Sequence, residues 1–551
     1  MAVEPSEQSM KSASSWWLRA WLAVAVLVGS ALRFVGLTFG FPLRVHPDEW
    51  AIIDNAIDLA KRNSFEPTFV DRPDHFEIKL NFLVDSVYAW LRHGMSLVEA
   101  YTKHPLEFVF IGRGISAVFG VACIVLAYLI VRRVAPWAGV VAAGLVAVFP
   151  PLVLNSHYAT PESPQLFFTL LLMLFCMMYL ESPRTLFVVL AAASVGVGCT
   201  IKYPAIITAV MIAVVVTVVA VRKRDGWLFV RHGLVAVGSV LATIAVVSPV
   251  LITGFGRVHE AVFRMAVPEH LGADGLGWAG NAGFYASTFL GSAGLLLAVA
   301  ALGGAVWSLR HHPISTLPIW AGLVYWLIMS GVALHWTRWA VPMYVTPLLF
   351  GGIGIYALVT WVWRTTLLTA GWQRLLAKAV VVLGLALLAV NQLLSATVVS
   401  VSLTAKDTRV VGRDYTKSIG ATKKNTIFEG YTPMLPYAPW GVFDQFDLRS
   451  GELKLSQKAL DPAKFLILSG GMRARYLAES KYAAEQEFYR AVTESLPQLR
   501  VIEPVTQGPP SVWEPLNIQG QAAVLAGYLG GGFSGPAIYF YDLSAVPRAP
   551  G

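Results

Sequence analysis

Residues 21–50 read WLAVAVLVGSALRFVGLTFGFPLRVHPDEW. The first part, Trp21–Leu37, is almost wholly apolar, whereas Arg44–Glu49 is a compact polar segment. An α-helix needs roughly 20 mainly apolar residues to cross a bilayer. The stretch therefore predicts a membrane helix that ends beside a polar loop. Polar residues precede this helix and Arg33 lies within it, so we expect it to be retained rather than cleaved as a signal peptide.

The composition extends this prediction to the whole chain. Of the 551 residues, 56% are hydrophobic and 14% are charged, which excludes an ordinary soluble protein and a disordered one. The net charge of +9 would suggest nucleic-acid binding in a soluble domain, but most Lys and Arg lie between apolar runs and are better explained as topology signals. The three cysteines lie inside apolar segments without metal or redox spacing, so we interpret them as packing residues.

Ten further apolar segments follow the first. A charge and a proline at Lys202-Tyr203-Pro204 favour a break between two of them. The sequence therefore predicts a mainly α polytopic membrane protein with about eleven spans within residues 17–401, after a tail at residues 1–16. The ten segments are Phe108–Val131, Trp137–Leu154, Pro164–Leu180, Leu186–Ile201, Ala205–Val221, Gly233–Ile252, Phe284–Leu309, Leu317–Leu334, Trp339–Trp363 and Ala379–Val401.

Lys and Arg are concentrated in alternate loops, and short cytoplasmic loops hold this excess. The N-terminus is then expected in the cytoplasm, and the loop 40–105 on the external face of the plasma membrane. Residues 402–551 have a soluble composition and predict a small external α/β domain. Its expected strands are Phe465–Ser469, Leu499–Glu503 and Ala537–Tyr541, with a helix near Tyr476–Leu496.

The polar segment that opens the first loop is the first candidate site. Asp48 and Glu49 follow His46-Pro47 and open an expected helix, Asp48–Arg62. They are either helix N-terminal acids favoured by the helix dipole or a general base with a supporting carboxylate at the membrane surface. The rest of the loop predicts amphipathic helices that lie on the bilayer. Within them, Lys79 is either an interfacial residue or a phosphate ligand.

Other polar residues fall at span ends on the same predicted face. The turn between the third and fourth spans holds His157 and Glu162, although Thr160-Pro161-Glu162 also reads as a helix start. Cations around an acidic pair suit an anionic substrate. The spacing does not indicate a metal site; no cofactor is identified, and a divalent cation at the carboxylates is left open. The remaining candidates are Lys202, Tyr203, Arg264, His270, His335 and Arg338.

A single base, several cations and a site covered by the amphipathic helices of the first loop suit the transfer of a sugar from a lipid phosphate. The phosphate is a good leaving group, so cations that offset its charge and a carboxylate that takes the acceptor's proton are the main requirements.

Several motifs resemble the GT-C superfamily of membrane glycosyltransferases, most closely the branch of protein O-mannosyltransferases and lipid A aminoarabinose transferases. The resemblance covers roughly residues 17–400 and is carried by His46-Pro47-Asp48-Glu49, His75-Phe76-Glu77-Ile78-Lys79, His157–Glu162, Ile201-Lys202-Tyr203-Pro204 and Arg338.

The resemblance implies a polyprenyl-phosphate sugar donor, a glycan, lipid or protein acceptor, and inversion by single displacement. It implies that Asp48 is the base, Glu49 its support, Glu162 the second acid, and Lys79, Lys202 and Arg338 the cations of the site. Lys79 is followed by Leu80-Asn81 rather than by prolines, and no large insertion separates the later spans, which favours a bacterial enzyme of the broader branch.

Two other classes of protein are weighed against this interpretation. A transporter or flippase requires ionisable residues in mid-span, and Arg33 and Arg113 are the exceptions to otherwise apolar spans. A non-catalytic scaffold that displays the C-terminal domain leaves the clustering of acids and cations unexplained.

Overall fold

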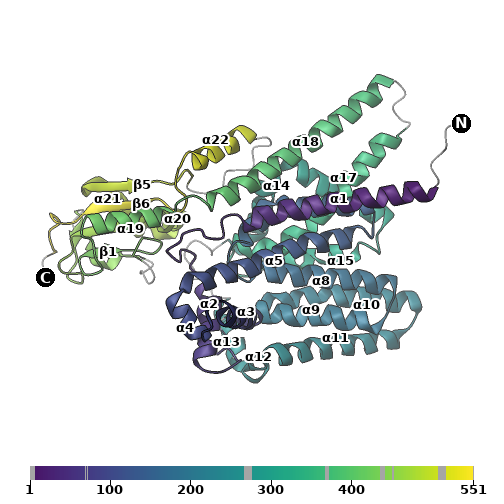
Figure 1. The fold of residues 1–551 in the computed structure, drawn as a ribbon, viewed down its shortest axis with the longest axis horizontal. Coiled ribbons are helices and arrows are strands. Elements are labelled where there is room, and N and C mark those ends of the chain that lie inside the picture. The colour runs from purple at the N-terminus through teal and green to yellow at the C-terminus, as the bar shows by residue number, and fades with distance from the viewer. Residues whose placement is uncertain are drawn as a thin grey trace.

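The computed structural model describes residues 7–68, 70, 72–265, 276–365, 371–434, 441–448, 452–506 and 517–549. Side chains are described from Trp16 onward and not at residues 264–265, so the expected site residue His270 and the Arg264 side chain lie outside this description. Figure 1 shows a bundle of helices with a smaller strand-containing region at one end. Helix α1 (Glu7–Phe34) begins at the opposite end of the bundle from that region.

The bundle confirms the prediction of a polytopic membrane protein. Among the described residues, eight helices are long and apolar enough to cross a membrane, and three shorter apolar helices bring the total to the eleven expected. The bundle elements are α1 (Glu7–Phe34), α5 (Pro105–Val131), α6 (Pro136–Val148), α7 (Pro150–Asn155), α8 (Glu162–Glu181), α9 (Thr185–Ile201), η1 (Tyr203–Ala209), α10 (Val210–Lys223), α11 (Gly226–Val247), α12 (Val250–Thr253), α13 (Phe255–Met265), α14 (Gly277–His311), α15 (Leu317–Ala321), α16 (Leu323–Met329), η2 (Thr337–Ala340), α17 (Val341–Arg364) and α18 (Gly371–Ser402).

Small residues allow α14 and α17 to pack closely at the centre of the bundle. A Cβ added to Gly304 would lie 1.9 Å from the Phe350 carbonyl oxygen, and one added to Gly354 would lie 1.9 Å from that of Ala300. Backbone contact of this kind is typical of membrane helices, because dispersion rather than hydrophobic burial holds them together. This packing fixes α17, whose preceding turn η2 carries Arg338.

The third predicted span is two helices rather than one. It breaks between α6 and α7, where Pro150 and Pro151 remove backbone donors. The Arg33 side chain, which is fully buried, donates to the freed carbonyls of Ala147 at 2.8 Å and Val146 at 2.9 Å. These bonds satisfy carbonyls that would otherwise be orphaned in an apolar environment.

The first loop folds into three amphipathic helices, where two were expected. They are α2 (Trp50–Lys61), α3 (His75–His93) and α4 (Leu97–Lys103). In Figure 1 they lie at the end of the bundle that faces the C-terminal region. We call this the loop end.

The C-terminal region confirms the predicted α/β character. A four-stranded sheet has the order β1-β4-β6-β5, with β1 and β4 parallel and the other pairs antiparallel. The predicted strand Phe465–Ser469 is confirmed as β4, and the other two expected strands match β5 and β6 within a residue or two. The strands are β1 (Thr426–Phe428), β2 (Phe446–Asp447), β3 (Lys454–Leu455), β4 (Phe465–Ser469), β5 (Gln498–Ile502) and β6 (Ile538–Asp542).

The predicted helix near Tyr476–Leu496 is confirmed in α21 (Ala483–Ser495), which a 3-10 turn at Ser480–Tyr482 separates from the preceding helix α20 (Gly470–Leu477). The sequence missed the strand β1 and the helices α19 and α22. The helical elements of the region are α19 (Thr408–Ser418), η3 (Phe443–Gln445), α20 (Gly470–Leu477), η4 (Ser480–Tyr482), α21 (Ala483–Ser495) and α22 (Ile518–Leu529).

Buried hydrogen bonds attach the C-terminal region to the bundle. Arg409 on α19 donates to the Val45 carbonyl at 2.9 Å, two residues before the Asp48 turn begins at Pro47. Gln521 on α22 accepts from the Ser395 hydroxyl at 2.8 Å and donates to the Asn391 side chain at 3.1 Å, both on α18. The region is therefore held against both α18 and the first loop.

Candidate active site

Asp48 lies in the turn before α2 and forms ion pairs with two arginines. Arg72, from the segment that precedes α3, lies 3.1 Å from Oδ1, and Arg338 from η2 contacts Oδ2. These three residues are 24 and 290 positions apart in the chain, so the fold assembles them. The Asp48 side chain is 21% exposed, so it remains accessible to solutes while it is paired.

The electrostatics of this group fix its protonation. Burial alone would raise the pKa of Asp48, but the charges of Arg338 and Arg72 outweigh that effect and hold its pKa well below the usual range. Burial lowers the pKa of His46 despite the nearby Glu49 and Asp48. His46 is thus neutral at pH 7, and its Nδ1 accepts the Asp48 backbone N–H at 3.3 Å. Its ring packs on Tyr158, with the ring centroids 4.2 Å apart.

Glu49, the residue before α2, has a different partner from its neighbour Asp48. It is fully buried, and its carboxylate accepts bonds from Arg113 Nε at 2.7 Å and Nη2 at 2.9 Å. Arg113 also donates to the carbonyls of Leu37 and Phe39, at 2.7 and 3.0 Å. Glu49 therefore anchors the first loop to α5 and holds the turn that carries Asp48.

Glu162, the second predicted acid, begins α8 and forms an ion pair with Lys202, whose Nζ lies 2.7 Å from Oε1. The Glu162 side chain is buried and that of Lys202 is nearly so. Lys202 ends α9, where the predicted break before Pro204 turns the chain into η1. The break places the ammonium group at the loop end of the bundle.

Two cavities meet at this cluster. The domain-side cavity, about 370 Å³, is lined by Asp48, His46 and Tyr158 of the bundle and by Tyr431 and Arg475 of the C-terminal region. The bundle-side cavity, about 240 Å³, is largely apolar and is lined by Arg72 and Lys202 together with η1, α16 and η2 residues. The residues that line both are Glu162 and Arg338.

The two cavities differ in what they can bind. Tyr325, Met329, Val332 and Trp339 give the bundle-side cavity an apolar wall beside its cations. This combination suits an amphiphile with an anionic head. The domain-side cavity exposes a carboxylate and aromatic rings, which suits a polar acceptor. Asp48 lines the domain-side cavity and contacts Arg72 and Arg338, which line the bundle-side cavity.

The structure does not bring every predicted residue into the cavities. Lys79 is bound to Glu66 at 2.6 Å and lies 4.7 Å from the centre of the Phe65 ring, so it lines neither cavity. His157 lies between the backbone carbonyls of Val153 and Val35, each 2.9 Å from a ring nitrogen. It secures the α7 turn rather than facing the cavities.

Of the other two aromatic candidates, Tyr203 lines a cavity of the site and His335 does not. His335 packs against Phe284, with ring centroids 4.6 Å apart, and lines neither cavity. Tyr203 lines the bundle-side cavity, and its hydroxyl donates to the Val70 carbonyl at 2.7 Å. That bond ties η1 to the segment that carries Arg72.

Sequence reasoning missed several residues of the site, among them Arg72, Tyr431 and Arg475. Arg72 was visible in Arg72-Pro73-Asp74, two residues from an acid that it contacts, but nothing in the sequence distinguished it from Lys79. Tyr431 and Arg475 come from the C-terminal region, which carries no recognisable motif. Only the fold brings these two residues to Asp48.

Within the described part of the chain, no three or more His, Cys, Asp or Glu side chains are grouped so as to hold a metal ion. The carboxylates of Asp48 and Glu162 are instead paired with Arg72, Arg338 and Lys202.

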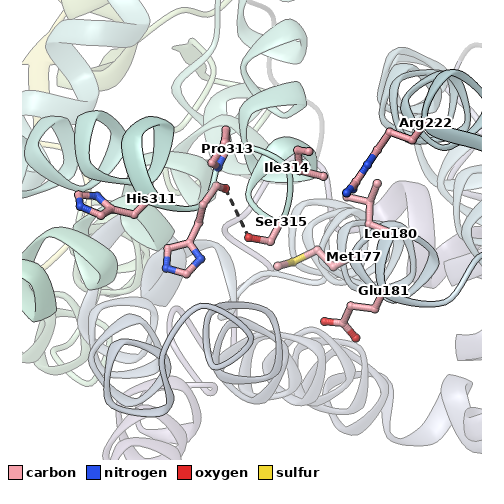
Figure 2. Close-up of a pocket in the computed structure, with 9 residues that line it drawn as sticks. Met177, Leu180, Glu181, Arg222, His311, Pro313, Ile314 and Ser315 are labelled. Carbon is pink, nitrogen blue, oxygen red and sulfur yellow. Dashed lines mark hydrogen bonds between the residues drawn. The ribbon is translucent and has the colours of Figure 1, made fainter.

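A third cavity, about 350 Å³, lies at the far end of α8 (Figure 2). It is lined by Met177, Leu180 and Glu181, with Arg222 from α10. Glu162 and Glu181 are the two ends of this 20-residue helix, so at 1.5 Å per residue this cavity is roughly 30 Å from the site. Glu181 pairs with Arg133 there, and no residue of the Asp48 cluster is near.

The geometry can now be compared with known proteins. The sequence model of the dolichyl-phosphate-mannose-protein mannosyltransferase family matches residues 108–252. The fold resembles the oligosaccharyltransferase of Archaeoglobus fulgidus in its apo form, with a TM-score of 0.50 and 12% identity over 85% of this chain and 71% of that one. The chain therefore has the fold of the GT-C superfamily of membrane glycosyltransferases, and residues 108–252 match the model of one family with that fold.

Another GT-C protein of known structure is ArnT from Cupriavidus metallidurans bound to undecaprenyl phosphate, with a TM-score of 0.46 and 14% identity over 98% of this chain and all of that one. No curated protein matches by sequence. The segment matched by the family model contains Glu162, Lys202 and Tyr203 but not Asp48 or Arg338. The sequence match and the ion-pair cluster are thus largely separate observations.

Proposed function

We propose that this protein transfers a sugar from a polyprenyl-phosphate donor to an external acceptor by inverting single displacement, with Asp48 as the general base. In this proposal residues 1–16 are a cytoplasmic tail, residues 17–401 form the transferase domain, and residues 402–551 form an external domain. The loop end then faces the outside of the plasma membrane.

The observation that carries the proposal is the position of Asp48. It lines the domain-side cavity, and its carboxylate is bound to Arg72 and Arg338, which line the bundle-side cavity. A base and the cations for a leaving group thus lie in one cluster, on opposite sides of the boundary between two binding spaces. Single displacement with inversion needs its nucleophile and leaving group on opposite sides of the anomeric carbon.

The bundle-side cavity fits the donor. Its apolar wall can hold the first isoprene units, and Arg72, Lys202 and Arg338 can hold the phosphate. Arginine suits phosphate because its planar fork donates two parallel bonds. The matched family is named for dolichyl-phosphate-mannose, a polyprenyl-phosphate sugar, which supports the same class of donor.

The reaction then proceeds with one proton to move. An acceptor hydroxyl oxygen attacks the anomeric carbon and the bond from that carbon to the phosphate oxygen breaks, with its electron pair left on the phosphate. The hydroxyl proton passes to Asp48 and afterwards to water. Arg72, Arg338 and Lys202 offset the growing negative charge of the phosphate, so no protein acid is needed for the leaving group.

Donor binding also explains how Asp48 can accept a proton although its pKa is low. Two guanidinium groups keep the pKa of Asp48 low while they pair with it. A phosphate in the bundle-side cavity competes with Asp48 for Arg72 and Arg338, because both arginines line that cavity. Sharing these cations with the phosphate raises the basicity of Asp48 when the donor is present.

The charged residues that would favour a transporter have structural partners. Arg33 is held by the carbonyls at the α6 break, and Arg113 by Glu49. They support the frame of the bundle, and neither lines the two cavities at the loop end.

The test is transfer by the purified full-length protein in nanodiscs, with polyprenyl-phosphate mannose tried first among lipid-phosphate sugars and a membrane extract as the source of acceptors. Asp48→Asn should lower transfer by roughly 10²- to 10⁴-fold, the usual contribution of a general base. Asp58→Asn is the matched control, since Asp58 lies in the same loop and pairs only with exposed Arg62 among the ion pairs of the described residues. Near wild-type turnover by Asp48→Asn would refute the assignment.

A further inference from the structure

The C-terminal region supplies part of the wall opposite Asp48. Tyr431 follows β1 and Arg475 lies on α20, which follows β4. Because β1 and β4 are parallel neighbours, the chain leaves both strands at the same edge of the sheet. The two side chains therefore meet, and both line the domain-side cavity. The carboxyl ends of β1 and β4 thus face Asp48 across this cavity.

These residues form an ordered cluster with Trp336. The Arg475 Nη2 group donates to the Tyr431 hydroxyl at 2.8 Å. Its guanidinium carbon lies 5.1 Å from the centre of the Tyr431 ring and 5.6 Å from that of Trp336. Arg338 lies 5.6 Å from the same Trp336 ring. Trp336 therefore links the arginine that binds Asp48 to the arginine of the C-terminal region.

The cations of the site divide by cavity. Arg72 and Lys202 line the bundle-side cavity, Arg338 lines both, and Arg475 lines the domain-side cavity. The first three serve a donor phosphate in the proposed function. Arg475 is on the side from which the acceptor approaches Asp48, so its charge acts on the acceptor. A guanidinium fork beside aromatic rings binds a carboxylate or phosphate group and the face of a sugar ring together.

We propose that Arg475, Tyr431 and Trp336 form an acceptor subsite for an acidic glycan, one that carries a carboxylate or phosphate group next to its reactive hydroxyl. This inference rests on the proposed function only where it calls the bound glycan the acceptor of the transfer. The binding site itself does not depend on turnover. The aromatic rings hold the sugar face, and Arg475 pairs with the acidic group and so turns the hydroxyl toward Asp48.

Binding is measured on the full-length protein in nanodiscs by saturation-transfer NMR titration, with methyl glucuronide and glucose 6-phosphate as acidic probes and methyl glucoside as the neutral one. A charge-assisted arginine bond predicts that the acidic probes bind roughly tenfold tighter or more. Arg475→Gln should abolish this preference and Arg475→Lys should retain part of it, because lysine keeps the charge but not the fork. Tyr431→Phe, which removes the hydroxyl that orients Arg475, should reduce it several-fold.

Arg473→Gln is the control, since Arg473 is on the same helix but lies over Tyr539, 5.9 Å from the ring centre. Equal binding of acidic and neutral probes to the wild type, or an unchanged preference in Arg475→Gln, would overturn the subsite. Asp48→Asn separates the two proposals. If it transfers normally but the acidic preference still depends on Arg475, the function fails and the subsite stands. If it loses transfer while no acidic preference is found, the function stands and the subsite fails.

Discussion

Converting each of the adjacent carboxylates Asp48 and Glu49 to its amide should have opposite effects: Asp48→Asn should lower turnover, and Glu49→Gln should lower stability. Glu49 is fully buried and binds the fully buried Arg113 through two bonds, at 2.7 and 2.9 Å. Removing one partner of such a pair costs about 3–5 kcal/mol, because the other charge stays buried without compensation. Asp48 and its two arginines are each 21–32% exposed, so solvent can replace their contacts.

The magnitude for Glu49→Gln follows from what Arg113 keeps. Its bonds to the Leu37 and Phe39 carbonyls remain, as does the Phe39 ring 3.6 Å from the guanidinium carbon. We therefore expect the lower end of the range, about 3 kcal/mol, which is roughly a 150-fold change in the unfolding equilibrium. Asp48→Asn should cost less than this, because solvent reaches Asp48 and both of its arginines and can replace the lost contacts.

The assay is reversible unfolding of the purified protein in mixed micelles, titrated with SDS, alongside donor-dependent transfer. Glu49→Gln should lose stability and keep the turnover of its folded fraction, whereas Asp48→Asn should keep stability and lose turnover. Replacing both partners by apolar residues, Glu49→Leu with Arg113→Met, should recover much of the stability. If Glu49→Gln were as stable as wild type but inactive, the division of roles between the two carboxylates would be wrong.

Other predictions follow from the same contacts. Because Arg338 and Arg72 lower the pKa of Asp48, Arg338→Gln should move the acid limb of the pH profile of kcat/KM for the donor, which reports the free enzyme, to higher pH; an unmoved limb would contradict the pairing. Lys202→Arg should raise the KM for the donor more than that for the acceptor, and equal changes would count against a phosphate role. Lys79→Met should leave donor use unchanged, since Lys79 is bound to Glu66 outside both cavities. Burial raises the pKa of Glu429 to about 8 from its usual 4.5, so the folded C-terminal region holds a proton that the unfolded chain releases. The contribution of Glu429 to the stability of this region should therefore be most favourable below about pH 4.5 and fall as the pH rises toward 8. Hydrogen exchange at β1 and β4 of the full-length protein should detect this fall, and Glu429→Gln should flatten it.

The membrane part of the fold was predictable because its signal is local. A run of apolar residues predicts a span whatever surrounds it, and each expected segment corresponds to one or two helices of the bundle. The break after Ile201 was visible in Lys202-Tyr203-Pro204. The C-terminal region was harder, since β1 has three residues and is stabilised by pairing with β4, about 40 positions later.

The site was only partly predictable because its charges are paired through space. Asp48, Glu162, Lys202 and Arg338 were expected, and the structure brings them to two adjoining cavities. Lys79 and Arg72 lie in the same loop and carry the same charge. They differ in their partners, because Lys79 binds Glu66 and Arg72 contacts Asp48. No pattern in a single sequence encodes that choice.

The buried arginine of α1 also bears on how this protein is made. Arg33 lies in the last turn of the first span and donates to the Gly29 carbonyl of the same helix, but the other two carbonyls that accept its bonds belong to residues 113 and 114 positions later. When α1 enters the bilayer, these partners have not yet been synthesised, and the guanidinium must stay with lipid headgroups and water at the membrane surface. Its burial waits for α6. Closure of the bundle around Arg33 therefore cannot precede insertion of the third span, and it joins the first helix to that span after both are inserted.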